Sequence, residues 1–356
     1  MLTIKGELFS AAAKARVRKG TLLDGGFLRR LLDCSQVSDV AHMLKSTYYG
    51  NFLPADAEAL HRDEFEFLLL NVVNNEVQSF LSSVGLERRA FLKLWLERQD
   101  IQLIRNRIRG IYAGNDMSAE AEMDLSSLNL SLVDKQKLFS SSRIDEVIAS
   151  IKNKRLVAYV EDSMKRSAGG TSPSFMMGFA LDAFQNNRVF DAVECFPGEE
   201  KEKLLSIIGT YLDVLNITFI YRGKKYFNMP GEFALSILYS RYRVNFEMLK
   251  TIASLPPERM WEPLAGTRYA SLLPIEGVND GLSDAEGITR NMRSIQRASA
   301  LRVFQSGSAG VHSVLAYITL RELEILDLSA IIEIVRYNYD RKKAEKLIAY
   351  PLAGGW

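Results

Sequence analysis

Apolar residues recur along most of this chain at the spacing of a helix. Residues 63–84 are apolar with Asn and Glu interposed at helical intervals, and residues 91–112 continue in the same way from Phe91 to Ile111. Residues 311–348 show the pattern again. Strict alternation of apolar and polar residues, which marks a half-buried strand, is almost missing. The pattern therefore predicts an all-α fold.

One of these helical runs, opened by an acidic residue, occurs three times. Asp100, Asp213 and Glu324 align, and they lie 113 and 111 residues apart. A second set of segments, 31–49, 138–156 and 251–269, has a similar interval. In these segments Val40, Val147 and Met260 align, and so do Leu44, Ile151 and Leu264. A third match, 73–81 with 185–193, links the first two copies. Self-similarity at a fixed period indicates one structural unit built several times.

The length of 356 residues suits three units, because it exceeds the size at which a single core usually stops growing. We predict helical units at 1–124, 125–230 and 231–356. Residues 115–131 and 168–174 are expected to be loops, and residues 197–203 to begin a helix. The break at 221–233 should lead into the third unit. The longest irregular stretch, 265–287, has a length typical of functional or mobile loops.

Composition narrows the setting in which the protein works. Lys and Arg number 45 against 43 Asp and Glu, a net charge of +2 that gives no reason to expect nucleic acid. Cys34 and Cys195 lie far apart in sequence, so two buried free thiols, as in a reducing cytoplasm, are favoured over the alternative of a disulfide. No signal peptide and no segment near 18 uncharged apolar residues is visible, so any work at a membrane is expected from outside the bilayer.

The sequence carries no recognised catalytic signature. The phosphate loop, the dinucleotide fingerprint, the zinc motif HExxH, CxxC and GxSxG are all missing, and the QSGSAG around Ser308 lacks the first glycine of a nucleophile elbow. His42, His61 and His312 lie far apart, which favours structural or surface roles. We therefore assign no catalytic, cofactor-binding or metal-binding residue, and expect no cofactor and no small-molecule substrate.

Two features could still carry function. The first is a set of basic clusters, best interpreted as solvated helix faces and alternatively as contacts to an acidic protein surface or to lipid headgroups. They are Arg16, Arg18 and Lys19; Arg29 and Arg30; Arg105, Arg107 and Arg109; Arg222, Lys224 and Lys225; Arg241 and Arg243; and Arg341, Lys342 and Lys343. The second is the repeated acid. A structural role at the start of a helical turn is favoured there over binding, with pairing to an Arg of a neighbouring copy as a further alternative.

Several segments resemble one known family. ARVRKGTLLDGGFLRRLL at 15–32 and VSDVAHMLKSTYYG at 37–50 look like the N-terminal region of the C subunit of V-type and A-type ATPases, whose eukaryotic counterpart is the d subunit. Residues 314–352 resemble the end of that family, and residues 213–226 its repeated D/E-x-x-N-[LI] helix. Leu103 and Asp327 stand where the second copy has Asn216, so a shared hydrogen-bonding role for that position is in doubt.

The resemblance implies an all-helical funnel of three similar units around a pseudo-threefold axis. It implies a non-catalytic central-stalk subunit, peripheral on the cytoplasmic face of the membrane. Such a subunit would join the rotating shaft of the catalytic head to the proteolipid ring for ATP-linked proton or sodium transport. The alternatives are an all-helical scaffold or adaptor unrelated to rotary ATPases, and an enzyme whose site has no familiar motif. A scaffold of stacked repeats should be open-ended, whereas three large units favour a closed arrangement.

Overall fold

The computed structural model describes residues 2–54, 62–114, 130–166, 172–275 and 282–352. Most of these residues lie in helices. Over these residues the sole β-type pairing is an isolated bridge between Val133 and Ile151, so the all-α prediction is confirmed. The helices are α1 Leu2–Lys19, α2 Gly25–Leu32, α3 Val37–Lys45, η1 Tyr48–Asn51, α4 Arg62–Leu81, α5 Leu86–Ala113, α7 Lys135–Ser140, α8 Ile144–Ser150, α9 Lys154–Arg166, α10 Pro173–Glu194, α11 Gly198–Phe227, α12 Gly231–Ser236, α13 Phe246–Ser254, η5 Pro257–Arg259, η6 Glu262–Leu264, α14 Asp284–Gln305, α15 Val311–Arg336 and α16 Arg341–Leu347.

The chain order of these helices repeats three times. A long helix, a short turn and a second long helix occur as α4–α5, α10–α11 and α14–α15. Residues 73–81 and 185–193, which match in sequence, end the first helix of the first two pairs. Contacts divide the chain into two compact units, residues 1–88 with 196–356 and residues 89–195. The three-unit boundaries and the funnel stay predictions.

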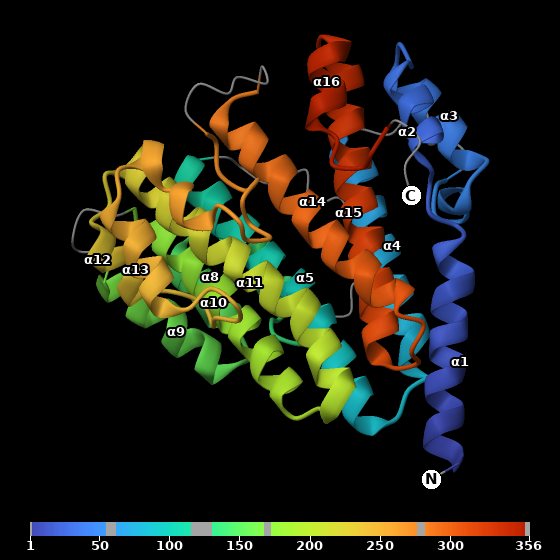
Figure 1. Ribbon diagram of the computed structural model, residues 1–356, viewed down its shortest axis with the longest axis horizontal. Coiled ribbons are helices and arrows are strands. Elements are labelled where there is room, and N and C mark those ends of the chain that lie inside the picture. The colour runs from blue at the N-terminus through green and yellow to red at the C-terminus, as the bar shows by residue number, and fades with distance from the viewer. Residues whose placement is uncertain (1, 55–61, 115–129, 167–171, 276–281, 353–356) are drawn as a thin grey trace. The chain divides into compact units, whose positions relative to one another are not determined.

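In the larger unit the central element is α15. It contains neither Gly nor Pro and is buried on nearly all sides, as expected for a core helix that is apolar all round. It packs against α1, α4, α11 and α14, and Figure 1 shows α14 and α15 running side by side. Ser283 and Glu286 form a capping box that starts α14.

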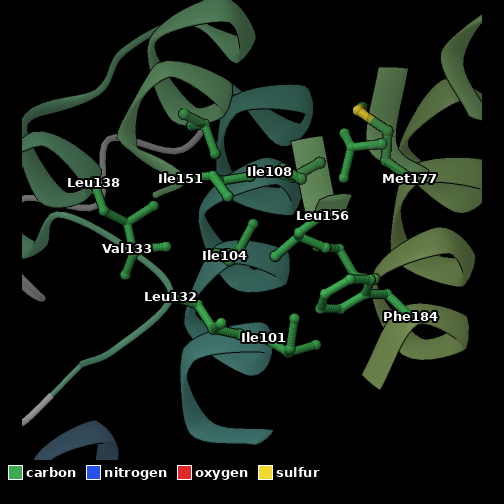
Figure 2. Close-up of a cluster of buried hydrophobic side chains, with 13 residues drawn as sticks. Ile101, Ile104, Ile108, Leu132, Val133, Leu138, Ile151, Leu156, Met177 and Phe184 are labelled. Carbon is green, nitrogen blue, oxygen red and sulfur yellow. The ribbon is translucent and has the colours of Figure 1, made fainter. Parts of the chain in front are cut away.

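The smaller unit has its own apolar core. Figure 2 shows side chains from α5, α9 and α10 meeting those of the segment that returns after α5. Ile104 and Leu156 are fully buried near its centre, and Val133 and Leu138 pack from the returning segment. The apolar residues that recur along α5 at helical spacing therefore form part of this core, as the sequence pattern predicts.

Two sequence predictions need correction. Residues 221–227 do not break the helix: α11 continues through Gly223, where a Cβ would lie 2.9 Å from Met229 Sδ, so close packing requires the glycine. The helix ends at Asn228, whose φ of 48° is the left-handed conformation of a C-terminal cap. Residues 265–275 are irregular as predicted, but the helix α14 already begins at Asp284.

The expected loops at 115–129 and 168–171, and His61, lie outside the described residues. The described part of 265–287 excludes 276–281. Helix α11 is long and apolar enough to cross a membrane by length and composition, a segment that inspection of the sequence missed. Within the fold, 72% of its apolar window is buried, as in the core helix of a soluble unit.

Candidate functional site

The three aligned acids lie well inside α5, α11 and α15, and they are nearly inaccessible to solvent. Asp100 is 2% exposed, Asp213 0% and Glu324 4%. The interpretation that they cap the start of their own helices is therefore wrong. Each carboxylate instead accepts hydrogen bonds from backbone N–H groups of another segment, which we call its return segment.

In α5, Asp100 holds the segment that leads into α7. One of its oxygens, Oδ2, accepts from Ser131 N at 2.8 Å and from Leu132 N at 2.6 Å. These donors lie 31 and 32 residues further along the chain. Asp134 then caps α7 by accepting from Lys137 N.

In α11, Asp213 holds the segment that leads into α13. Its carboxylate accepts from Tyr242 N at 2.9 Å, Arg243 N at 2.8 Å and Val244 N at 3.2 Å, which lie 29 to 31 residues further on. The Tyr269 hydroxyl donates a fourth bond at 2.7 Å. The cap of α13 follows directly, as it does for α7 after Asp100. The first two acids therefore hold equivalent return segments.

In α15, Glu324 holds a segment from the beginning of the chain. It accepts from Leu23 N at 2.5 Å and from the Tyr49 hydroxyl, across sequence separations of 301 and 275 residues. The next residue after Leu23, Asp24, caps α2. Tyr49 and Tyr269 end two of the segments that align in sequence, and each donates to one of the aligned acids, Tyr49 to Glu324 and Tyr269 to Asp213. Residues 23–49 therefore serve as the third return segment.

A buried arginine accompanies the third acid. Arg321, 0% exposed, donates to Glu324 at 2.6 Å and to the Thr21 hydroxyl at 2.6 Å. Its guanidinium also reaches the hydroxyls of Tyr49 and Tyr317 at 3.3 Å. An ionised pair removed from water needs such additional hydrogen bonds to offset its desolvation.

The position three residues after the acid has a common role in two copies. Asn216 Oδ1 accepts from Tyr239 N at 2.9 Å, 23 residues ahead. Asp327 accepts from Ala349 N at 3.1 Å and from Tyr350 N at 3.0 Å, 22 and 23 residues ahead. A shared hydrogen-bonding role at this position therefore holds for these two copies. In the first copy Leu103 packs against the apolar core instead.

The stretch of chain after α16 continues this arrangement. Once Asp327 has fixed residues 349–350, the backbone passes directly beside Gly25, whose Cβ would meet Pro351 O and lie 3.2 Å from Leu352 Cα. Leu23, bonded to Glu324, lies just before that glycine. The third copy is therefore completed by two chain segments that meet, where the second copy uses one continuous segment.

Burial changes the proton affinity of all three acids. Burial raises the pKa of Asp100 to about 6, against the lowering effect of its backbone hydrogen bonds. It also raises the pKa of Asp213 and of Glu324. For Arg321, burial opposes the charge, but Glu324 and the neighbouring tyrosines outweigh it and raise the pKa, so the guanidinium remains a cation.

A further contact joins the beginnings of the same three helices. Arg88, near the start of α5, donates to Glu200 of α11 at 3.1 Å and 2.6 Å. Glu200 also accepts from Val311 N, the first residue of α15, at 3.0 Å. Arg88, Glu200 and His312 are spaced 112 residues apart, close to the interval of the acids. This equal spacing is a signal in the sequence that could have pointed to the contact.

Most of the basic clusters make contacts within the chain. Arg18 pairs with Glu76, Arg105 with Asp182, and Arg341 with Asp33. Further basic side chains bond backbone carbonyls, as Lys224 does at the end of α13. The interpretation as balanced helix faces fits these contacts. Arg222–Lys225 is helical and not a turn, and its three basic side chains reach Thr289, Ala253 and Glu258.

Both cysteines are free, but they are not buried as predicted. Cys195 is exposed, and Cys34 is partly exposed. Of the histidines, His42 is exposed and His312 is 2% exposed. Among the residues that the structure describes, no group of three His, Cys, Asp or Glu side chains is arranged to hold a metal ion.

Comparison with known proteins assigns the class of protein. The model of the ATP synthase (C/AC39) subunit family matches residues 11–347, so the chain belongs to this family. Among its relatives are two proteins named as the C subunit of an A-type ATP synthase. The one from Methanobrevibacter smithii is 22% identical over 327 residues, which cover 90% of this chain and 82% of the relative. The one from Methanocaldococcus jannaschii is 20% identical over 332 residues, which cover 90% and 81%. The family match removes the alternative of a helical scaffold unrelated to rotary ATPases.

Proposed function

We propose that this chain is a non-catalytic central-stalk subunit of a rotary A/V-type ATPase. In that role it joins the shaft of the catalytic head to the proteolipid ring and transmits torque during ATP-linked transport of protons or sodium ions. The observation that carries the proposal is the threefold use of one device, a buried acid in a long helix that holds a return segment, in a chain of this family.

A coupling part has to be stiff, and the contacts supply stiffness at two levels. The helices α5, α11 and α15 contain 28, 30 and 26 residues, which makes each about 40 Å long or more at the helical rise of roughly 1.5 Å per residue. Their beginnings are tied through Glu200, and the middle of each is tied through its acid to a return segment. Hydrogen bonds to charged groups are the stronger ones, and burial protects them from water.

The proposal places the protein at the cytoplasmic face of the membrane as a peripheral component. Its partners are the shaft subunits and the proteolipid ring. The burial of α11 supports attachment through protein contacts, since its apolar surface is already used inside the fold. If those contacts are largely polar, raising the salt concentration should weaken them.

The test is deletion of the gene, followed by assays of membrane vesicles and cytosol. The catalytic head should still hydrolyse ATP, but the vesicles should not pump ions, and the wild-type gene should restore pumping. Pumping at the wild-type rate without this chain would refute the coupling role. Calorimetry of the isolated chain with Mg-ATP should show no specific heat of binding, because the sequence lacks a phosphate loop.

A further inference from the structure

A histidine lies at the contact that joins the three helix beginnings, at a position where the other two copies have permanently charged side chains near neutral pH. At the positions spaced 112 residues apart, the first copy has Arg88, the second Glu200 and the third His312. Arg88 and Glu200 form a double hydrogen bond, and their side chains are 16% and 12% exposed. His312 is 2% exposed and can exist in a neutral or a charged form.

The imidazole of His312 is held from one side only. Its Nε2 shares a 2.8 Å hydrogen bond with Ser308 Oγ. The same hydroxyl accepts from Lys203 Nζ, which also reaches Ser306 Oγ at 2.8 Å. The other ring nitrogen, Nδ1, is buried and has no hydrogen-bond partner.

The unpartnered nitrogen lies close to the carboxylate of Glu200. A Cβ on Gly310 would be 2.6 Å from His312 Nδ1 and 3.0 Å from Glu200 Oε1, so the two atoms border the same small space. Oε1 is already engaged, because it accepts from Arg88 Nε and from Val311 N. The glycine is needed here for space, since any side chain would displace the imidazole or the carboxylate.

Charged groups of both signs face His312. On α11 these are Lys203, 15% exposed, together with Glu200 and the exposed Glu199, which pairs with Lys203 at 2.6 Å. From α5, Arg88 offsets the charge of Glu200. From α1, Arg16 donates to the carbonyl of Gly307 in the turn before α15. Burial, followed by Lys203, lowers the pKa of His312, and the glutamates oppose this effect without reversing it.

We propose that His312 is a proton-operated latch on the turn between α14 and α15. In its neutral form His312 donates Nε2–H to Ser308 Oγ, which also accepts from Lys203, and its Nδ1 carries no proton, so Glu200 holds only Arg88 and Val311 N. A protonated ring places a second cation beside Lys203 and turns its Nδ1–H toward Glu200, in competition with the two donors already there. Acidification therefore loosens the third helix beginning from the other two.

The consequence for coupling rests on the proposed function. In a torque-transmitting protein, loosening this contact lowers stiffness at the point where all three long helices begin. The latch would therefore reduce ion transport per ATP hydrolysed when the surrounding pH falls. The local change itself can be tested on the isolated chain.

The first experiment follows the latch directly. The chain has three histidines, so isotope labelling of histidine alone gives a simple NMR spectrum of ring signals. The His312 signal, assigned with His312→Gln, should titrate at lower pH than an ordinary histidine. Hydrogen exchange should show, after correction for intrinsic rates, that amides of 198–203 and 311–313 lose about threefold or more protection between pH 7.5 and 5.5.

Variants separate the latch from general acid sensitivity. His312→Gln keeps a neutral polar side chain and should abolish the pH dependence of these amides, whereas His42→Gln should leave it unchanged. The same pH profile in the wild type and in His312→Gln, or an unshifted titration of His312 in the wild type, would overturn the proposal. Once the three histidine signals are assigned, the NMR titration is measured on the wild-type chain, so it does not depend on the stability of a variant.

A vesicle assay then distinguishes this proposal from the function. The ratio of ion transport to ATP hydrolysis should fall at acid pH more steeply with the wild-type chain than with His312→Gln. Opening in the exchange experiment without any coupling in vesicles supports the latch and contradicts the proposed function. Coupling with no opening at the three helix beginnings supports the function and contradicts the latch.

Discussion

The neutralising substitution Asp100→Asn should make the smaller unit less sensitive to pH. Burial raises the pKa of Asp100 from 3.8 to about 6, so the folded protein binds a proton there more tightly than the unfolded chain does. Stability from this group is thus fully present below pH 3.8 and is lost as the pH rises through about 6. A difference of this size corresponds to about 3 kcal/mol, at 1.36 kcal/mol for each pKa unit.

The variant keeps an acceptor for the two backbone donors but carries no charge. Its Oδ1 can still accept from Ser131 N and Leu132 N, both of which use one oxygen of Asp100. Near neutral pH the gain from removing a buried charge therefore offsets much of the weaker hydrogen bonding. Asp100→Ala, by contrast, leaves the buried Leu132 N without an acceptor, at a cost of about 1–3 kcal/mol, whereas the exposed Ser131 can turn to water.

The assay is urea unfolding of the wild type and of Asp100→Asn from pH 4.5 to 7, with hydrogen exchange of the Leu132 amide as the local probe. The stability difference between the two proteins isolates this group from the other titrating residues. It should shift in favour of the variant by about 1–3 kcal/mol across this range. Asp145→Asn, at an exposed carboxylate of the same unit, is the matched control and should show no such shift. A difference between wild type and Asp100→Asn that is constant with pH would refute the reasoning.

Three further substitutions or deletions, one of them with a matched control, test the larger unit. Gly209→Ala places a Cβ 2.6 Å from Tyr242 Cβ and should lower stability by about 1–3 kcal/mol in thermal unfolding, whereas Gly287→Ala, with open space around it, should be neutral or slightly stabilising. Arg321→Leu leaves a buried carboxylate uncompensated and should cost about 3–5 kcal/mol in urea unfolding, and a result below about 1 kcal/mol would show that the pair is dispensable. Deleting residues 348–356 removes both backbone donors to Asp327, and should speed proteolysis of the N-terminal segment severalfold; an unchanged cleavage rate would contradict the contact at Gly25.

The helical class and the repeat could be predicted because both are written in local patterns. Apolar spacing identifies α5 and α15 without any tertiary information, and the acids at 100, 213 and 324 keep an interval that the contacts later explain. The end of α11 was misplaced because Gly223 reads as a helix breaker. Gly223 is required instead because Met229 packs against it, a tertiary contact that local sequence patterns do not reveal.

The role of the acids could not be deduced from local sequence. A lone Asp beside apolar residues is compatible with a cap, a salt bridge or a ligand, and only the return segment decides between them. That segment lies about 30 residues away for Asp213 but 301 residues away for Glu324. The interval of 112 residues between Arg88, Glu200 and His312 was available in the sequence. These residues differ in charge, so a search for matching residue types misses them, and only their equal spacing points to the contact.

The third copy shows why a sequence period does not by itself define a structural unit. The sequence repeat has the same interval wherever the first unit is taken to begin. The contacts, in contrast, show which return segment is bonded to which long helix. By contacts, the unit is a pair of long helices followed by the return segment that its acid holds. Defined in this way, the return segments of Asp100 and Asp213 follow their helices along the chain, about 30 residues after each acid. The segment bonded to Glu324 instead begins at Leu23, near the other end of the sequence. Its rigidity rests on the buried network around Arg321, and this is a physical reason for the third acid to carry an arginine that the other two lack.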